Sequence, residues 1–149
     1  MTDTVRPPEA LRHLLSWQAG RLATISARLT AKRLPLEARS DFAVLASLTE
    51  YGELSQAELG RILGLDRNNV NGIVTRLEGN QHVERRADPA DRRRNIVSLT
   101  DTGRIHFIEL QAHAAAVQSE LLGDLTSTEQ HRLVELLDRV LAGHPAQPA

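Results

Sequence analysis

Two closely spaced helix signals near the middle of the chain constrain its fold more than any other feature. Ser55 and Glu58 have the spacing of a capping box, in which the two residues satisfy each other's free backbone amides. Gly64 suits the left-handed residue that ends the helix opened there, and Asp66 is a good N-cap for a second helix. The second helix has one apolar face, formed by Val70, Ile73, Val74 and Leu77. Two short helices joined by so tight a turn form a helix-turn-helix.

Longer helices are expected on both sides of this motif. Apolar residues three and four apart predict one amphipathic helix over residues 9–34, which Pro35 ends. Another helix follows up to about Tyr51. On the far side of the motif, Gly103 is expected to open a long helix, and a second capping box at 126–129 starts a final helix.

A short hairpin with a basic tip lies between the motif and the later helices. Residues 83–86 and 95–99 have the pattern of strands, and the turn-forming tract at 88–91 joins them. Three consecutive arginines, Arg92, Arg93 and Arg94, follow this turn. The order of elements predicts a mainly α (α+β) fold: a winged helix-turn-helix with a two-stranded wing, held between long terminal helices.

Composition and charge narrow the class of protein. The chain has 149 residues, which suits one domain, and no cysteine, which excludes disulfides, thiolate nucleophiles and cysteine-bound zinc. It shows neither the ~20 apolar residues that a membrane span needs nor a signal region, so a cytoplasmic location and no membrane partner are expected. Residues 61–94 carry 8 arginines against 5 acidic residues, whereas the whole chain has a net charge of −1. This asymmetry indicates an anionic partner, and the alternative is a solvated charged surface.

The sequence resembles the MarR family of bacterial transcriptional regulators in two segments, LSQAELGRILGLDRNNVNGIVTRLE at 54–78 and VERRADPADRRRNIVSLTDTG at 83–103. The second segment is the more specific, because a D-P-x-D-R-R wing followed by V-x-L-T-x-x-G is close to a family signature. The resemblance implies a single domain over 1–149, with dimerisation helices at about 9–34 and 104–142 and a winged helix-turn-helix at about 36–103. The tail at 144–149 is expected to be disordered.

One departure from the family pattern lies where the second helix of the motif meets the wing. Family members usually read Gly-Leu-Val where this chain has Gln81, His82 and Val83. The glycine that ends the helix in those proteins is missing, so Gly79 or Asn80 is expected to take the left-handed conformation instead.

The polar face of the second helix is the candidate surface for reading DNA. At about 100° per residue, the side opposite the apolar face carries Asn68, Asn71, Gly72 and Thr75, with Arg67 at its N-terminal end and Arg76 on its flank. In the major groove asparagine pairs with adenine and arginine with guanine, and Gly72 lets the helix backbone approach the bases. The alternative is an exposed polar helix face with a tolerated glycine.

Further DNA contacts are expected around this helix. The resemblance implies that the three wing arginines enter a flanking minor groove, whose negative potential attracts arginine. Asp91 is expected to orient one of their guanidinium groups. Ser55 and Gln56, at the start of the first helix of the motif, are expected to donate to phosphate. For the wing, the alternative is a solvated basic turn.

The function implied is that of a sequence-specific regulator of transcription. One winged helix covers one half-site, so the resemblance implies a homodimer that binds a pseudo-palindromic operator in double-stranded DNA as a ligand-responsive repressor. The alternatives are a metal-responsive regulator and an interaction protein that does not bind DNA. No phosphate-binding loop, nucleophile elbow or metalloprotease motif is present, so no enzyme activity and no cofactor are expected.

The resemblance also implies a crevice for a small aromatic or anionic effector between the dimerisation helices and the DNA-binding lobe. His13, Trp17 and Arg21 share a stripe of the first helix, and Phe42 or Tyr51 is expected near them. The alternative is that Trp17 packs in the core or in the dimer interface.

Histidines of the helix after the wing raise the question of a metal site. His106, Glu109 and His113 lie on one side of that helix. The two histidines are about 10 Å apart along the helix axis, which is too far for one ion, so no metal site is expected.

Overall fold

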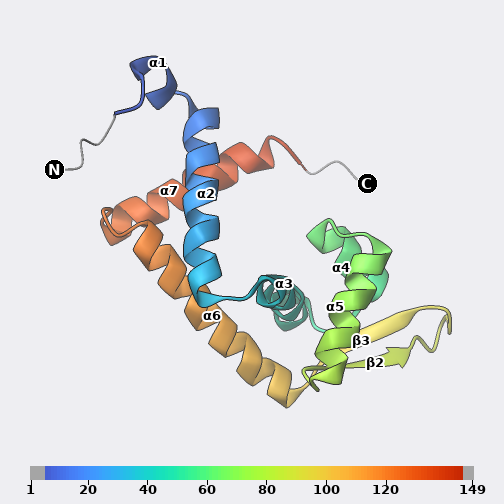
Figure 1. Ribbon diagram of the computed structural model, residues 1–149. Coiled ribbons are helices and arrows are strands. Elements are labelled where there is room, and N and C mark those ends of the chain that lie inside the picture. Colours follow the sequence, from blue (N-terminus) through green and yellow to red (C-terminus); the bar gives the residue numbers. More distant parts are fainter. Residues whose placement is uncertain (1–5, 146–149) are drawn as a thin grey trace.

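The computed structural model describes residues 6–145, in which seven helices and three strands form (Figure 1). The helices are α1 Glu9–Arg12, α2 Leu15–Arg33, α3 Leu36–Tyr51, α4 Gln56–Leu63, α5 Arg67–Gly79, α6 Asp101–Leu121 and α7 Ser127–Ala142. The strands are β1 Leu54–Ser55, β2 Val83–Ala87 and β3 Asn95–Leu99. None of the described helices is long and apolar enough to span a membrane. Residues 146–149, most of the tail predicted to be disordered, lie outside the described residues.

The mainly helical winged helix-turn-helix fold is as predicted. Helices α4 and α5 and the sheet form one lobe, α1, α2 and α7 lie at the other end, and α3 and the long α6 run between them (Figure 1). The core fills the lobe and its contacts with α3 and α6. Its fully buried apolar side chains are Val44, Leu45, Leu59, Val70, Val74, Leu77, Val83 and Val97. Helix α7 has no buried residue in the chain as described.

The wing belongs to a three-stranded antiparallel sheet in the order β1-β3-β2, one strand more than predicted. Strands β2 and β3 form the hairpin, in which Arg85 lies opposite Val97. Strand β1 lies on the other edge of β3 and pairs Leu54 with Val97 and Ser55 with Ile96. Two residues are too few to show the alternation by which strands are recognised, and Ser55 is also the N-cap of α4, so the sequence pattern indicated only the helix.

The single N-terminal helix predicted over residues 9–34 is wrong, because α1 ends at Arg12 and α2 begins at Leu15. Between them Leu14 is extended, with φ −88° and ψ 116°. The carbonyl of Arg12 accepts a hydrogen bond from Gln18 Nε2 at 2.6 Å, which replaces a bond of the interrupted helix. Neither glycine nor proline occurs at the break, so no sequence signal marks it.

The turn between α5 and β2 uses Gln81 as its left-handed residue. Gln81 has φ +62° and is the one non-glycine residue of the described chain with a positive φ. Its amide and that of His82 donate to carbonyls of the last helical turn, each at 2.9 Å, which is the bonding of a Schellman motif. The expectation that Gly79 or Asn80 takes this conformation is wrong, since Gly79 is the last helical residue and Asn80 has φ −87°.

The first turn of α6 packs on this turn, and Gly103 permits the contact. The predicted start of this helix at Gly103 is two residues late, since α6 begins at Asp101. Its N-cap is Thr100, whose side chain accepts from the Gly103 amide at 2.9 Å. The Thr100 amide donates to the His82 carbonyl at 3.1 Å. A Cβ atom at Gly103 would lie 1.9 Å from that carbonyl oxygen. Glycine is therefore required by the close approach of two backbone segments.

Replacing Gly103 by alanine should destabilise the protein strongly. Because the clash is with a backbone carbonyl, either α6 or the turn must move, and we expect a loss of about 3 kcal/mol in the free energy of unfolding. Gly79→Ala is the matched control: its Cβ meets nothing within 4 Å, so this change at a helix end should be neutral or stabilising. Urea denaturation measures both variants. A loss below about 1 kcal/mol for Gly103→Ala would contradict the contact.

Two stacked histidines cover the same joint. The rings of His82 and His106 lie 4.1 Å apart between centroids and 16° from parallel. Nδ1 of His82 is buried and has no hydrogen-bond partner, whereas Nδ1 of His106 lies 3.5 Å from Glu109 Oε2. Burial lowers the pKa of His82, and the charge of His106 lowers it further, against the opposing effect of the carboxylates of Asp41 and Glu109. The folded protein therefore favours a neutral His82.

Stability should fall as the pH is lowered through the range in which an unfolded histidine takes up a proton, below about 6.5. In this range the unfolded chain binds the proton that folded His82 resists, so the free energy of unfolding decreases with decreasing pH. His82→Gln should make this decrease smaller. Urea denaturation between pH 8 and pH 5 tests this. Equal pH dependence of His82→Gln and wild type would show that His82 does not contribute.

Candidate nucleic-acid interface

Helix α5 presents the predicted polar face outward. Its apolar residues Val70, Ile73, Val74 and Leu77 are buried, as predicted. Its exposed residues are Arg67, Asn68, Asn69, Asn71, Gly72, Thr75 and, at its end, Gly79. A Cβ atom at Gly72 would meet nothing within 4 Å, so the middle of this face is open to a bulky partner. At the N-terminus of the helix, Asp66 accepts hydrogen bonds from the Asn69 amide at 2.8 Å and its Nδ2 at 2.7 Å.

Arg85 of β2 holds the wing against α4 and α5. Its Nη1 donates to Gln56 Oε1 at 3.3 Å and to Asn71 Oδ1 at 3.0 Å. Its Nη2 donates to Thr75 Oγ1 at 3.2 Å and to Glu78 Oε1 at 3.0 Å. The side chain is only 17% exposed. Sequence reasoning missed Arg85, although alternation from the buried Val83 places it on the same, inward face of the strand.

Arg76 is directed to α3 rather than to solvent. Its Nη2 forms an ion pair with Asp41, which is buried, and also donates to Ser40 Oγ at 3.2 Å and to the Glu37 carbonyl at 3.5 Å. The bond to Asp41 raises the pKa of Arg76. Arg76 was expected to contact DNA from the flank of α5. In the structure its guanidinium group instead bonds α3 and so links α5 to α3.

Ser55 is not available as the phosphate donor that its position predicted. It is 1% exposed, because it is at once a residue of β1 and the N-cap of α4. Its Oγ accepts from the Glu58 amide at 3.2 Å, and its own amide donates to Glu58 Oε2 at 2.8 Å, which completes the predicted capping box. Oγ also donates to Glu58 Oε2, at 2.7 Å. The same bonds to Ser55 lower the pKa of Glu58. Gln56 is half-buried and bonds Arg85 and Asn71.

The wing tip is shaped by backbone bonds to aspartates. Asp91 was expected to orient a guanidinium group, but its Oδ1 accepts from the Arg93 amide at 3.0 Å and it takes part in none of the ion pairs found among residues 6–145. Arg94 turns back, so that its Nη2 donates to Ser55 Oγ at 3.3 Å. Arg92 and Arg93 are exposed, and their guanidinium groups make no hydrogen bond within the described chain. Two of the three wing arginines are thus free to meet an anion.

The residues predicted to bind an effector do not come together. Arg21 lies over the Trp17 ring, 5.0 Å from its centroid, on the surface of α2, and His13 lies in the break before that helix. Phe42 stacks on Phe107 at 5.6 Å, and Tyr51 is exposed at the end of α3. Spacing on one helix therefore placed only Trp17 and Arg21 side by side.

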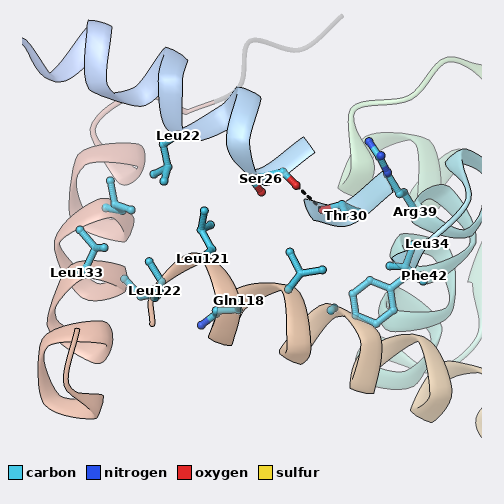
Figure 2. A pocket seen from close by; sticks show the side chains of 14 residues that line it. Leu22, Ser26, Thr30, Leu34, Arg39, Phe42, Gln118, Leu121, Leu122 and Leu133 are labelled. Carbon is cyan, nitrogen blue, oxygen red and sulfur yellow. Dashed lines mark hydrogen bonds between the residues drawn. The ribbon is translucent and has the colours of Figure 1, made fainter. Parts of the chain in front are cut away.

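A cavity of about 390 Å³ lies instead between α2, α3, α6 and α7 (Figure 2). Leu22, Leu121, Leu122 and Leu133 line one end, and Arg39 and Phe42 lie at the end formed by α3 (Figure 2). Arg39 Nη2 makes a long bond to the Ala27 carbonyl, 3.4 Å, and Nε is buried without a partner. Sequence reasoning missed Arg39, because its place in this cavity depends on the packing of four helices that are far apart in the sequence.

Residues 6–145 contain no group of three or more histidine, aspartate or glutamate side chains that could hold a metal ion. His106 stacks on His82 and pairs with Glu109, whereas His113 is exposed two turns further along α6.

Comparison with known proteins identifies the family of the chain and its fold. The model of the MarR family matches residues 38–94. The transcriptional repressor NicR of Pseudomonas putida is 32% identical over 100 residues, which are 67% of this chain but only 63% of that protein. The chain thus spans less than two thirds of the length of this curated relative.

Two solved structures resemble nearly the whole chain. The transcriptional regulator PcaV of Streptomyces coelicolor, solved in complex with its natural ligand, is 27% identical with a TM-score of 0.75. The match covers 94% of this chain and 100% of PcaV. BpsR of Bordetella bronchiseptica, solved to explain regulation of its DNA binding by 6-hydroxynicotinic acid, has a TM-score of 0.68 and 28% identity over 83% of this chain and 98% of that one. Sequence, fold and the arrangement of α4, α5 and wing agree: the chain belongs to the MarR family of transcriptional regulators.

Proposed function

We propose that this protein regulates transcription by binding double-stranded DNA with α5 and the wing. The observation that carries the proposal is the open polar face of α5 beside the two free arginines of the wing tip, Arg92 and Arg93. Helix α5 enters the major groove with Asn68, Asn71 and Thr75 toward the bases, and the wing reaches the flanking minor groove. The relative NicR is a repressor, which favours repression over activation for this chain as well.

The DNA-binding form is a homodimer. The protein exposes large apolar side chains at the end away from the wing; on α7 these are Val134, Leu136, Val140 and Leu141, at 40%, 41%, 47% and 65%. Leu14 and Leu15, before and in α2, are 50% and 56% exposed. A second copy would cover these surfaces, and two α5 helices would then read two half-sites of one pseudo-palindromic operator. Residues 36–103 form the DNA-binding part, and α2, α6 and α7 the dimerisation part.

DNA from upstream of the protein's own gene is the first substrate to test. In a mobility-shift assay the wild type should form a complex that contains two chains. Gly72→Leu should abolish specific binding, because the leucine side chain would occupy the space on α5 into which the base edges of the major groove must fit. The unfolding temperature should change little, since a Cβ at this position meets nothing within 4 Å. Absence of any shift at low salt would contradict DNA binding and favour an interaction protein.

The wing should contribute charge rather than base hydrogen bonds. Replacing Arg92 and Arg93 by alanine should weaken binding and reduce the slope of log K against log salt by about 1 for each lost phosphate contact. Arg86→Ala is the matched control, since Arg86 belongs to the same hairpin but its guanidinium pairs with Glu53, before β1, at 2.7 Å. Equal salt slopes for wild type and the double variant would exclude the wing-tip arginines from the interface.

We further propose that the cavity of Figure 2 binds a small aromatic acid that weakens DNA binding. Its leucines and Phe42 suit an aromatic ring, and the buried Nε of Arg39 lacks a partner that a carboxylate would supply. An acid of this kind, 6-hydroxynicotinic acid, regulates the DNA binding of BpsR. A metal effector is less favoured, since no suitable cluster occurs among the described residues.

Arg39→Met should uncouple the protein from this effector. The probes are benzoate and 6-hydroxynicotinic acid, added to the protein–DNA complex. The variant should bind DNA as wild type does but require at least about tenfold more acid for release, because it lacks the charge-assisted bond. Lys32→Met, which removes a charge of α2 outside the cavity, is the control and should respond as wild type. An unaltered response of Arg39→Met would place the effector elsewhere.

A further inference from the structure

We propose that Arg85 determines which base Asn71 reads, by holding the Asn71 amide so that it offers only N–H donors to the major groove. This inference rests on the proposed DNA-binding function. Arg85 is a positioning residue in this account: its side chain is largely buried, and it acts on the base through Asn71 and Thr75.

The orientation of the Asn71 amide follows from the chemistry of its partner. A guanidinium group has five N–H donors and no acceptor, so the Asn71 atom that faces Arg85 at 3.0 Å must be Oδ1. The Gln56 amide obeys the same rule, since its Oε1 accepts from Arg85 at 3.3 Å. Its Nε2 is thereby left to donate to Asn71 Oδ1, at 3.5 Å. Both amides are ordered by one donor-only group.

This orientation changes what Asn71 presents to DNA. Oδ1 is occupied by Arg85 and Gln56, whereas Nδ2 makes no hydrogen bond within the described chain. Pairing with adenine, expected from the residue type alone, needs both a free Oδ1 and a free Nδ2. With Nδ2 alone, Asn71 seeks an acceptor: guanine offers N7 and O6, and thymine offers O4. Adenine offers N7 as well, but its amino group beside N7 then lacks the acceptor that a free Oδ1 would supply.

Thr75 is biased in the same direction. Its Oγ1 accepts from Arg85 Nη2 at 3.2 Å, which leaves the hydroxyl proton to be donated elsewhere. One turn apart on the same exposed face, Asn71 and Thr75 therefore both offer donors. This face of α5 then selects for guanine or thymine, on one strand of each half-site, at the base position that Asn71 contacts.

Arg85 is itself held firmly enough to impose this orientation. Glu78 pairs with Nη2 at 3.0 Å, and strand pairing opposite Val97 sets the position of the backbone. Four acceptors surround one planar group, a set that the single ammonium of lysine cannot reach in this geometry. The wing thus contributes to base recognition through the side chains of α5, in addition to its own contact with DNA.

The test is selection of bound sequences from a randomised DNA pool, with wild type, Arg85→Met and Arg86→Met. The Asn71 position is identified as the one whose preference Asn71→Ala relaxes. There the wild type should prefer guanine or thymine over adenine by about fivefold or more. Arg85→Met frees Oδ1 and should admit adenine, whereas Arg86→Met loses the same charge from the same strand and should keep the wild-type preference.

The outcomes separate this inference from the function on which it rests. If the wild type selects no sequence, DNA recognition and this inference fail together. If it selects a site but prefers adenine at the Asn71 position, or if Arg85→Met keeps the preference for guanine or thymine, only the role of Arg85 is overturned. A general loss of affinity without a change of preference also overturns it, because a merely structural role would produce that result.

A second variant keeps the test decisive if Arg85→Met does not fold. Asn71→Asp retains an oxygen that accepts from Arg85 but removes the outward donor. It should lose the preference for guanine or thymine and gain tolerance of cytosine and adenine, whose amino groups donate. Retention of the wild-type preference by Asn71→Asp would contradict the proposed amide orientation.

Discussion

The contact between Gly103 and the His82 carbonyl is the constraint on which the rest of the structure depends. It joins three elements at one point: the end of α5, the start of β2 and the first turn of α6. The turn on one side requires Gln81 in a left-handed conformation, and Thr100 and Thr102 donate to the Gln81 carbonyl from the other side, at 2.7 Å and 3.1 Å. Because α6 also carries α7, this joint connects the DNA-binding lobe to the far end of the molecule (Figure 1).

Several polar side chains of the lobe bond its helices and strands to one another. Arg76 fixes α5 on α3, Arg94 bonds the N-cap of α4, and Arg86 pairs with Glu53 before β1. Each of these arginines adds positive charge near the proposed DNA surface while its side chain is committed to a protein partner. Such commitments reduce the conformational entropy that binding would otherwise cost, so the recognition surface is ordered before DNA arrives.

The sequence predicted what depends on neighbours along the chain and failed where distant segments meet. Both capping boxes, the buried face of α5 and the hairpin follow from spacing within a few residues, and they are present as predicted. The capping spacing that identified Ser55 gave no information on its burial by β1, which depends on Ile96. Likewise Arg85 and Arg39 look like ordinary surface arginines until the strands pair and the helices pack. Local sequence patterns therefore could not predict which side chains from distant segments bond each other.

Helix α3 supplies a physical route from the proposed effector to DNA. Arg39 lines the cavity, whereas Asp41, two residues later on another side of the helix, holds Arg76 of α5. Packed helices move as rigid bodies, so a ligand that shifts α3 also shifts α5. In a dimer the two α5 helices must match half-sites about 34 Å apart, and a small rotation of each lobe changes that spacing without altering any residue that meets a base. The ligand needs only to favour the mismatched spacing, and its effect on DNA affinity equals its difference in affinity for the two arrangements.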